Sequence, residues 1–454
     1  MSRLYYKENF DERINEILDN LIKRCPNEPM FAKTVKEYFY SLKPLYKSSP
    51  ELFYCGIPER ITEPEKTIIF RVPWTDDKGE IRVNRGYRVK FSTALGAGKG
   101  GLRFKSGVNL DEIKTLAFSQ VFKNALTGLP MGGAKGGADF DPKGKSDGEV
   151  MRFCQSFVKG LYNGIGEEKD IPAGDMGVGE REIGYMFGEY KRLTERFGCS
   201  FTGKGINYGG LKLRKEATGY GLVYFVNEIL KDTGEEFSGK RAVVSGSGNV
   251  ALYAIKKAIS LGATVVAASD SDGVVYDDGG IDCELLKEIK EEKRGRIREY
   301  MAIKKRAVYY DNPKDIWRIK CDFAFPCATQ NELDEEDAET LIKNGCKLIA
   351  EGANLPCTGA AIEKFKKSGI VFAPFKAANA GGVAASGFEI IQNSAHFYFT
   401  EEESDKMLKE IMRNIYITCR DAAKENGAEG DLTAGANIAS YKKVAAAVLA
   451  EGCV

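Results

Sequence analysis

Hydrophobic residues recur at helical spacing within the first fifty residues of the chain. Ile14, Ile17, Leu18, Leu21 and Ile22 are predicted to share one face of a helix. After residue 67 the spacing changes, because "TIIFRVPW" and "GEIRVNRGYRVKFSTAL" are rich in β-branched and aromatic residues. The turn-forming "TDDKG" separates these two stretches, so they predict a β-hairpin.

Further helices are predicted beyond the hairpin. Asn109 and Glu112 resemble a capping box with Asn in place of Ser or Thr, and Gly128 and Pro130 end the helix that follows. A second helix is predicted over 179–197, where apolar residues repeat at helical spacing. The final stretch, "ANIASYKKVAAAVLAEGCV", predicts a terminal helix.

From about residue 240 onward, short apolar segments alternate with polar helical ones. The apolar segments are found in "RAVVSGSGNVA", "GATVVAASDS", "CDFAFPCA", "CKLIAEGAN" and "GIVFAPF". This alternation predicts a doubly wound parallel sheet. We therefore expect an α/β protein with an N-terminal α/β substrate domain and a Rossmann-like dinucleotide-binding domain.

The first of these predicted strands leads into a glycine motif. Gly246, Gly248 and Ala251 form G-x-G-x-x-A after a strand and before an apolar-periodic helix, and a second strand then ends at Asp270. The first glycine permits a tight turn, the second admits a pyrophosphate, and the alanine lets helix and strand pack closely. The helix N-terminus offers N–H groups to the phosphates. The motif therefore predicts a dinucleotide site.

The residues around this motif leave the choice of cofactor open. An acidic residue at the end of the second strand usually binds the ribose 2′-hydroxyl, so Asp270 argues for NAD. Ser269 and Ser271 flank it with hydroxyl donors, and Arg294 and Arg296 follow in the sequence. These groups are suited to a 2′-phosphate and hence to NADP.

A second glycine-rich stretch, "PMGGAKGGADFDPKGK", lies far upstream of the dinucleotide motif. Gly144, Lys145 and Ser146 supply the end of a phosphate-binding loop, but Asp139 stands where its first glycine is needed. An NTPase is therefore not expected. Lys143 and Lys145 are interpreted as solvated loop charges.

The remaining lysine of this stretch belongs to a candidate anion site. Lys99 and Lys135 are flanked by glycines, and Gln120 and Lys123 are neighbours on one helix. Clustered ammonium groups repel one another, so the least solvated one is expected to lose its proton below the usual pKa of about 10.4 and to act as an acid or base. Asp175 lies in a glycine-rich turn before a helix, whose dipole favours its ionised form.

Composition and charge narrow the class of protein. The 454 residues are 43% hydrophobic and 29% charged, which fits a globular protein of two to three domains. With 66 Lys+Arg against 65 Asp+Glu, no nucleic-acid or membrane-surface partner is expected. The charged N-terminus lacks a signal-peptide pattern, and no apolar run is long enough to span a membrane.

Cysteine and histidine usage argues against a metal site. The 11 cysteines are dispersed without a CxxC pair, as in reduced cytoplasmic enzymes, and most are expected to be small buried hydrophobes. The one histidine, His396, is expected to be a surface or packed residue. Acid–base chemistry is therefore assigned to Lys, Asp, Glu or Tyr side chains.

Several long motifs resemble the hexameric glutamate dehydrogenases of the Glu/Leu/Phe/Val dehydrogenase family. These are "KGGLRF", "FKNALTGLPMGGAKGG", "IPAGDMGVGEREIGYM", "TGKG", "EATGYG", "GSGNVA", "PCATQNEL" and "KAANAGGVAASGFE". The resemblance spans nearly the whole chain. It implies reversible oxidative deamination of L-glutamate to 2-oxoglutarate and ammonium with a nicotinamide cofactor. "SDS" and "GSGNVA" resemble the NADP-using branch, so NADP is favoured and NAD stays the alternative.

The resemblance also implies roles for individual residues. Lys135 would be the catalytic lysine, and Asp175 would shuttle protons. Lys99 and Ser386 would bind the side-chain carboxylate, Gln120 and Lys123 the α-carboxylate, and Gly174 the substrate through its backbone. The residues expected to bind the cofactor are Thr218, Gly246, Ser247, Gly248, Asn249, Val250, Asp270 and Ser271.

The resemblance further implies a homohexamer, and the dispersed cysteines without a secretory signal predict a cytoplasmic location. Residues 1–211, joined by a helix at about 431–454, would form the substrate-binding and oligomerisation domain. Residues 212–430 would form the dinucleotide-binding domain with hinge helices. Two rival interpretations are a dehydrogenase of apolar amino acids, whose pocket would not need Lys99, and a non-catalytic nucleotide-binding protein, which would not need Asp175.

Overall fold

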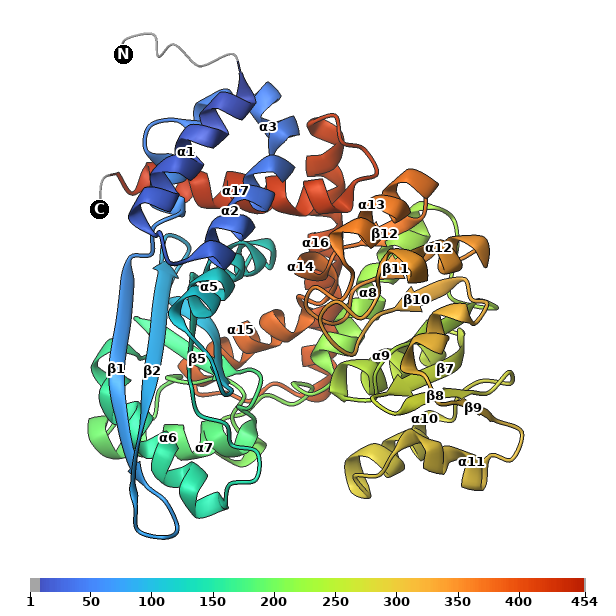
Figure 1. The fold of residues 1–454 in the computed structure, drawn as a ribbon, viewed down its shortest axis with the longest axis horizontal. Coiled ribbons are helices and arrows are strands. Elements are labelled where there is room, and N and C mark those ends of the chain that lie inside the picture. The colour runs from blue at the N-terminus through green and yellow to red at the C-terminus, as the bar shows by residue number, and fades with distance from the viewer. Residues whose placement is uncertain (1–8, 453–454) are drawn as a thin grey trace. The chain divides into compact units, whose positions relative to one another are not determined.

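The computed structural model describes residues 9–452, which divide into two compact units. The first unit comprises the chain up to Lys212, Ser386–Thr400 and the chain from Asn437. The second comprises Leu213–Ala385 and Glu401–Ala436. Each unit is built around one sheet (Figure 1). None of the helices in residues 9–452 is long and apolar enough to cross a membrane.

The first unit has a five-stranded sheet in the order β1-β2-β4-β3-β5. Its strands are β1 (Lys66–Thr75), β2 (Ile81–Ser92), β3 (Gly98–Phe104), β4 (Gly133–Ala138) and β5 (Asp170–Gly174). Its helices are α1 (Phe10–Arg24), α2 (Pro29–Ser41), α3 (Lys43–Ser48), α4 (Ile57–Ile61), α5 (Leu110–Leu126), α6 (Asp147–Leu161) and α7 (Glu180–Thr194). β1 and β2 form the predicted antiparallel hairpin, whereas β3 runs parallel to both β4 and β5. The strands β3 and β4 were not predicted, because their glycine-rich sequences show no strand periodicity.

The two faces of this sheet carry different kinds of residue. Leu102 and Phe104 of β3 pack with Phe153 and Phe157 of α6 and with α7 in one hydrophobic core. Because side chains alternate along a strand, Arg103 lies on the opposite face, where α5 packs against β4. Arg103 therefore lies on the side of the sheet that α5 covers.

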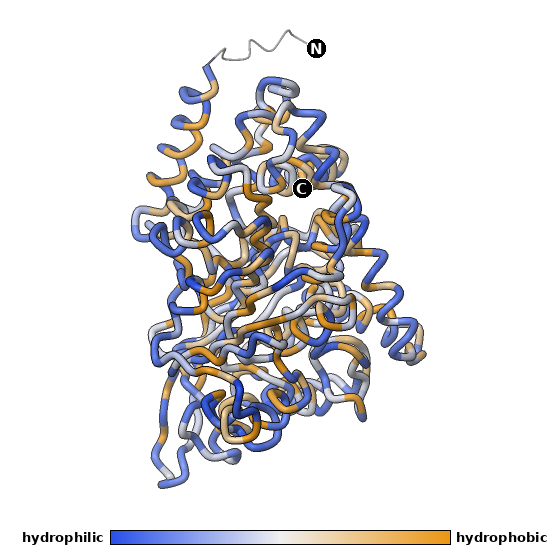
Figure 2. The backbone as a smooth tube through the Cα atoms, turned by 90° about the vertical axis from the view of Figure 1, so that its right-hand side faces the viewer, coloured by the Kyte–Doolittle hydropathy of each residue, from blue (hydrophilic) through white to orange (hydrophobic). Residues whose placement is uncertain are grey.

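The predicted helices are present, with differences at particular positions. Ile14 and Leu21 of α1 are fully buried, but Ile22 is 50% exposed, so it does not belong to the buried face. Figure 2 shows hydrophobic and hydrophilic turns alternating along α1, the helix that follows the grey N-terminal trace. α7 ends at Thr194 rather than at residue 197, and Phe197 is half exposed with its ring packed against Phe187.

The cap of α5 forms only in part as predicted. The Asn109 side chain accepts a hydrogen bond from the Glu112 backbone N–H at 3.0 Å. The Glu112 carboxylate accepts a hydrogen bond from Arg103. A residue expected to cap its own helix therefore also connects α5 to β3.

The second unit has a seven-stranded sheet in the order β12-β11-β10-β6-β7-β8-β9. Its strands are β6 (Arg241–Val244), β7 (Thr264–Asp270), β8 (Gly273–Tyr276), β9 (Val308–Tyr310), β10 (Phe323–Phe325), β11 (Leu348–Ala350) and β12 (Val371–Ala373). The five predicted strands are parallel, which confirms the α/β fold class. β8 and β9 add two antiparallel strands that were not predicted. The sheet is therefore mixed.

The helices complete the description of the second unit. They are α8 (Ala217–Asp232), α9 (Asn249–Ser260), α10 (Cys283–Lys287), α11 (Tyr300–Ile303), α12 (Glu335–Lys343), α13 (Gly359–Ser368), α14 (Phe375–Ala378) and α16 (Glu401–Glu425). Two helices, α15 (Gly381–Ser394) and α17 (Leu432–Ala450), contain the points at which the chain re-enters the first unit. There, Tyr441 of α17 stacks on Phe53 and donates a hydrogen bond to the Leu52 carbonyl.

The packing of α8 against α9 generates a stability prediction. A Cβ at Gly219 would lie 2.5 Å from Ala254 N and 2.6 Å from the Val250 carbonyl oxygen. We expect Gly219→Ala to lower the free energy of unfolding by about 1–3 kcal/mol, as overpacked cores do. The measurement is chemical or thermal unfolding of the purified variant.

Gly188→Ala is the matched control, because Gly188 also lies inside a helix but has nothing within 4 Å of its Cβ position. Alanine there is expected to raise stability by up to about 1 kcal/mol through helix propensity. Equal effects of the two substitutions would contradict the close packing of α8 and α9.

Candidate active site

Neighbouring parallel strands of the first unit carry three of the residues singled out in the sequence. Lys99 lies on β3, Lys135 lies on β4, and Asp175 directly follows β5. Leu102 of β3 pairs with Gly136 of β4. Because Leu102 faces the hydrophobic core, Lys135 projects from the other face of the sheet, which α5 covers.

Glycines allow these strands to approach more closely than residues with side chains would. A Cβ at Gly100 would lie only 1.7 Å from the Ala134 carbonyl oxygen. A Cβ at Gly101 would lie 2.8 Å from the Gly174 carbonyl oxygen and 3.2 Å from the Lys135 Nζ atom. The glycines beside Lys99 therefore keep open the space into which Lys135 projects.

A chain of alternating charges runs through this space. Lys135 Nζ lies 3.0 Å from Asp175 Oδ2, and Arg103 Nε donates a hydrogen bond to the same oxygen at 3.1 Å. Arg103 Nη1 in turn donates to Glu112 Oε1 at 2.7 Å. Mutual repulsion of lysines was expected here, but Lys135 is paired with a carboxylate.

The two cations control the ionisation of Asp175. Burial opposes the charged form, but the charges of Lys135 and Arg103 and their hydrogen bonds hold the pKa of Asp175 below its usual value. Asp175 is therefore held in its carboxylate form. A helix dipole was the predicted cause, whereas the charges that the structure shows beside it are Lys135 and Arg103. The signal for Arg103 in the sequence was a guanidinium within a glycine-rich strand.

A buried amide connects Lys99 to α5. Asn124 donates hydrogen bonds to the carbonyl oxygens of Lys99, at 3.0 Å, and Gly132. Its own oxygen accepts a hydrogen bond from Gln120 Nε2 at 2.7 Å. Lys123 is half-buried on the same helix. Asn124, which the sequence reasoning missed, therefore ties the predicted α-carboxylate residues to the strand of Lys99.

A buried ion pair also contacts β3, the strand that carries Lys99. Arg88 of β2 is paired with Asp170 through both carboxylate oxygens, and both side chains are almost fully buried. Arg88 Nη1 also donates to the Gly100 carbonyl oxygen at 3.0 Å. The backbone beside Lys99 is therefore held by a guanidinium that the sequence reasoning did not identify.

Ser386 meets a second hydroxyl from the loop after α7. Thr202 Oγ1 donates to Ser386 Oγ at 3.3 Å, and both residues are buried. The Thr202 backbone N–H donates to the Pro172 carbonyl of β5, adjacent to Ile171, which pairs with Lys99. In the first unit, the Thr202 hydroxyl therefore connects Ser386 with the strand that pairs with β3, on which Lys99 lies.

The glycine motif of the second unit has the geometry of a phosphate-binding turn. Gly246 has a φ of 89°, and its N–H donates to Ser269 Oγ at 2.9 Å. Its Cβ position lies 3.0 Å from Ala328 Cα, whereas Gly248, which caps α9, has nothing within 4 Å. The other predicted residues of the loop, Ser247, Asn249 and Val250, are half-buried or exposed. Open space at the start of a long helix fits a dinucleotide phosphate.

Two predicted cofactor residues lie at the N-terminal ends of helices. Thr218 is in the first turn of α8, and Asn249 begins α9. The Thr218 hydroxyl lies 2.5 Å from the position that a Cβ at Gly382 would take. A glycine at residue 382 therefore leaves room around this hydroxyl.

Asp270 is engaged by its own chain. Its Oδ2 atom accepts hydrogen bonds from the Ile297 backbone N–H at 3.0 Å and from Lys290 Nζ at 3.4 Å, and Oδ1 accepts from the Asp272 backbone N–H. The Asp270 side chain is only 4% exposed. Its carboxylate therefore holds the segment that contains residues 290–297.

That segment places a guanidinium beside Ser271. Arg296 Nη1 donates to Ser271 Oγ at 2.8 Å, and Arg296 Nε lies 3.2 Å from Asp272 Oδ2. The end of β7 therefore carries the Ser271 hydroxyl, the Arg296 guanidinium and the Lys290 ammonium beside the carboxylates of Asp270 and Asp272. The hydroxyl and the two cations are of a kind that binds phosphate.

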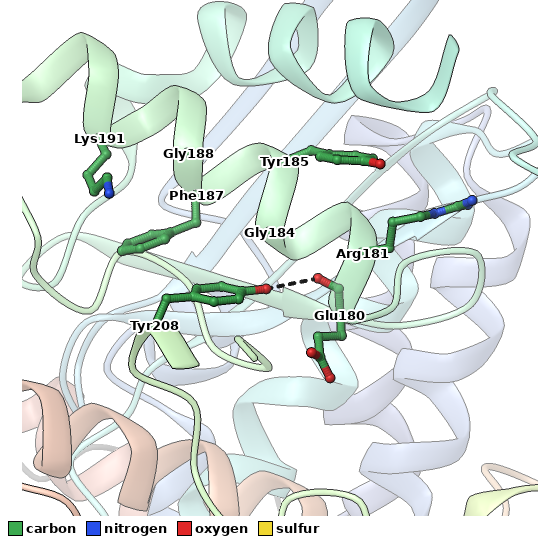
Figure 3. Close-up of a pocket in the computed structure, with 8 residues that line it drawn as sticks. All are labelled: Glu180, Arg181, Gly184, Tyr185, Phe187, Gly188, Lys191 and Tyr208. Carbon is green, nitrogen blue, oxygen red and sulfur yellow. Dashed lines mark hydrogen bonds between the residues drawn. The ribbon is translucent and has the colours of Figure 1, made fainter. Parts of the chain in front are cut away.

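Two of the pockets in residues 9–452 are lined by the first turns of α7. One, of about 620 Å³, is adjacent to the charge chain; it is lined by Phe104, Lys105, Asp141, Pro142, Lys143, Asp175, Met176, Gly177, Val178, Gly179, Arg181 and Glu182. The other, of about 530 Å³, contains none of the predicted site residues (Figure 3). In it, Tyr208 lies near-parallel to Phe187 and donates to the Glu180 carbonyl at 3.3 Å. The pocket that contains Asp175 is thus the one connected with the predicted chemistry.

The glycine turn of the second unit and the lysine–aspartate pair of the first are features of a dinucleotide-dependent dehydrogenase. The family model for Glutamate/Leucine/Phenylalanine/Valine dehydrogenase matches residues 209–452, and that for the Glu/Leu/Phe/Val dehydrogenase dimerisation domain matches residues 64–192. The chain belongs to the Glu/Leu/Phe/Val dehydrogenase family. The resemblance predicted from the motifs is therefore confirmed.

Several known proteins match this chain over nearly its whole length. An NADP-specific glutamate dehydrogenase of Helicobacter pylori is 52% identical over 97% of this chain and 99% of its own. One of Escherichia coli is 50% identical over the full length of both. The crystal structure of a Plasmodium falciparum glutamate dehydrogenase is 49% identical, with a TM-score of 0.96 over 100% of this chain and 97% of that one.

The charge chain generates a pH prediction. A base must be ionised to work, so the acidic limb of kcat/KM reports the pKa of that base in the free enzyme. Removing the Arg103 charge removes one of the influences that lower the pKa of Asp175. We expect Arg103→Gln to move the acidic limb to higher pH, measured in initial rates across the pH range.

Glu112→Gln is the control. It removes a carboxylate from the same guanidinium but leaves the contact between Arg103 and Asp175. The acidic limb of this variant is not expected to move to higher pH. If Arg103→Gln lowers the rate equally at every pH, Arg103 does not act through the ionisation of Asp175.

Proposed function

We propose that the chain catalyses the reversible oxidative deamination of L-glutamate to 2-oxoglutarate and ammonium, through the residues assigned below. It is an NAD(P)-dependent glutamate dehydrogenase with NADP as its cofactor, in agreement with relatives that are 50–52% identical over nearly the whole chain. Within this chain, the observation that carries the proposal is the pairing of Lys135 with an ionised Asp175 beside the buried Lys99.

Two groups of polar residues would hold the two carboxylates of glutamate. The buried Lys99 and the hydroxyl of Ser386 would bind the side-chain carboxylate. Gln120 and Lys123, on one face of α5, would bind the α-carboxylate, and the Gly174 backbone would contact the substrate. Two fixed anchors determine where the α-carbon lies, so most of the protein's contribution is orientation.

Asp175 and Lys135 would then handle protons at the α-carbon. Asp175 accepts a proton from the substrate ammonium group, which leaves a neutral amine whose lone pair assists departure of the hydride. Loss of the hydride leaves an iminium group, and the Lys135 ammonium, 3.0 Å from Asp175, would orient the water molecule that adds to its carbon. The two protons of that water pass to the nitrogen as the C–N bond breaks, which gives 2-oxoglutarate and ammonium, and Asp175 releases its proton to solvent.

The second unit fits a nicotinamide dinucleotide on the evidence of its glycine turn. NADP, when bound, accepts the hydride of the substrate α-carbon. Gly246 and Gly248 provide the turn and the open helix N-terminus for the phosphates, with Ser247 and Val250 contributing backbone. Thr218 and Asn249 would contact the cofactor from the starts of α8 and α9.

The contacts at the end of β7 account for a preference for NADP. Asp270 already accepts hydrogen bonds from Ile297 and Lys290, so we assign it to holding the basic segment rather than to the ribose. Arg296 and Ser271 would bind the 2′-phosphate through charge-assisted and hydroxyl hydrogen bonds.

The larger organisation follows from the family. We place substrate binding and subunit assembly in residues 1–211 with the C-terminal helix, and cofactor binding in residues 212–430. A homohexamer in the cytoplasm is the assembly and location that we propose.

Replacing Lys99 tests the substrate assignment. Hydrogen bonds to charged groups contribute about 1.5–3 kcal/mol, so Lys99→Leu is expected to lower kcat/KM for glutamate by about 10- to 100-fold. Norvaline has no side-chain carboxylate, so its turnover should change far less. The exposed turn lysine in Lys78→Leu is the control and should leave both rates unchanged. If Lys99→Leu lowers kcat/KM equally for glutamate and norvaline, the role assigned to Lys99 is contradicted.

Comparing NADPH with NADH tests both the activity and the cofactor site. Initial rates with 2-oxoglutarate and ammonium are expected to favour NADPH in the parent enzyme. Arg296→Ala should raise KM for NADPH by about tenfold or more, the worth of a charge-assisted hydrogen bond, and change KM for NADH little. Arg298→Ala is the matched control, because this exposed arginine faces Asp311. An unchanged NADPH preference in Arg296→Ala would contradict the assignment.

A further inference from the structure

A row of hydrogen bonds connects one face of α15 to the loop after α7. Ser386 meets Thr202, Glu389 accepts from the Gly203 backbone N–H at 2.8 Å, and Asn393 donates to the Gly209 carbonyl at 2.7 Å. Residues 386, 389 and 393 are separated by three and four positions, so they lie on one side of the helix. The loop therefore follows α15 for two turns, with Glu389 in the middle.

The central contact of this row is a fully buried ion pair. Lys204 Nζ lies 2.7 Å from Glu389 Oε1, and both side chains are 0% exposed. The same ammonium donates to the Phe201 carbonyl oxygen, and the Lys204 backbone N–H donates to Glu389 Oε1 at 3.2 Å. Each charge therefore has several partners, which a buried pair needs to offset desolvation.

This ion pair lies next to the hydroxyls at the predicted side-chain carboxylate site. Thr202 is two residues before Lys204, and Ser386 is one helical turn before Glu389. Burial raises the pKa of the Cys199 thiol to about 12, and Lys204, Glu389 and Lys99 all lie close enough to act on it electrostatically. The charges of Lys204, Glu389 and Lys99 therefore lie close to the same thiol.

We propose that Lys204 and Glu389 are positioning residues that set the enzyme's selectivity for a substrate with a side-chain carboxylate. The inference rests on the proposed function. The pair holds the Thr202 and Ser386 hydroxyls in place, and its two charges cancel, so that the substrate carboxylate responds to Lys99. A hydrophobic pair of the same size would give the loop stability without this electrostatic balance.

Removing one partner of the ion pair is expected to change glutamate turnover more than norvaline turnover, and this difference separates the proposed role from simple stabilisation. Lys204→Met leaves the Glu389 carboxylate buried and uncompensated, where it repels the side-chain carboxylate of glutamate. Norvaline carries no charge at that position and does not experience this repulsion. A merely structural loss would lower the turnover of both substrates together.

The test compares kcat/KM for L-glutamate and L-norvaline, with NADP, in the parent and three variants: Lys204→Met, Glu389→Gln and the double variant. We expect Lys204→Met to lower the glutamate-to-norvaline ratio by about tenfold or more, as loss of a partner to a buried charge does. Glu389→Gln leaves the Lys204 ammonium uncompensated, which attracts the substrate carboxylate, so this variant should raise the ratio. The double variant should fall between Lys204→Met and the parent.

Lys114→Met is the matched control, because Lys114 is also a buried lysine paired with a glutamate, Glu28, at 2.7 Å. It is expected to lower thermal stability and to leave the ratio unchanged. A parental ratio in Lys204→Met overturns the proposal. If Lys204→Met does not fold, Glu389→Gln decides: a parental or lowered ratio overturns the proposal, and a raised ratio supports it.

The parent enzyme separates this inference from the proposed function. Absence of glutamate-dependent NADP reduction in the parent would contradict the function itself. An active parent whose selectivity is unchanged in the variants would contradict only the role of Lys204 and Glu389.

Discussion

The close approach of β3, β4 and β5 is the constraint on which the candidate site depends. Lys135 lies on β4 and Asp175 directly follows β5, and their 3.0 Å contact exists because glycines let the backbones lie close together. A side chain at Gly101 would occupy the space beside the Lys135 ammonium. Because Coulomb attraction falls with distance and with access of water, an ion pair here needs that spacing.

The charges around these strands are arranged in pairs rather than in clusters of one sign. Arg88 is paired with Asp170, and Lys204 with Glu389. Burying either member of such a pair alone costs several kcal/mol, so each pair also fixes the backbone that carries its members. The contacts of Arg88 with Gly100 and of Glu389 with Gly203 show this directly. Neutralised pairs therefore form the frame within which Lys99 is held.

The second unit shows how one acidic residue can take either of two roles. Asp270 stands where an acidic residue commonly binds a ribose, and position alone favours NAD. In the structure its carboxylate accepts hydrogen bonds from Ile297 and Lys290, and the segment thus held presents Arg296 to Ser271. The cofactor preference that we infer therefore depends on which groups donate hydrogen bonds to the Asp270 carboxylate.

Periodicity, caps and glycine positions in the sequence act over short distances. They predicted a helix in the first fifty residues, those at 109–128 and 179–197 and the C-terminal helix, together with the hairpin, the five parallel strands and the dinucleotide turn. They did not predict α6, α8 or α16. The motifs of the sequence also identified the family. The sequence by itself did not show that β3 and β4 are buried strands, that Ile22 is exposed, or that β8 and β9 join the sheet. Nor did it reveal the partners of Arg103 or Lys204. Glu389 lies 185 residues from Lys204, and only the register of strands and the packing of α15 bring such distant charges together.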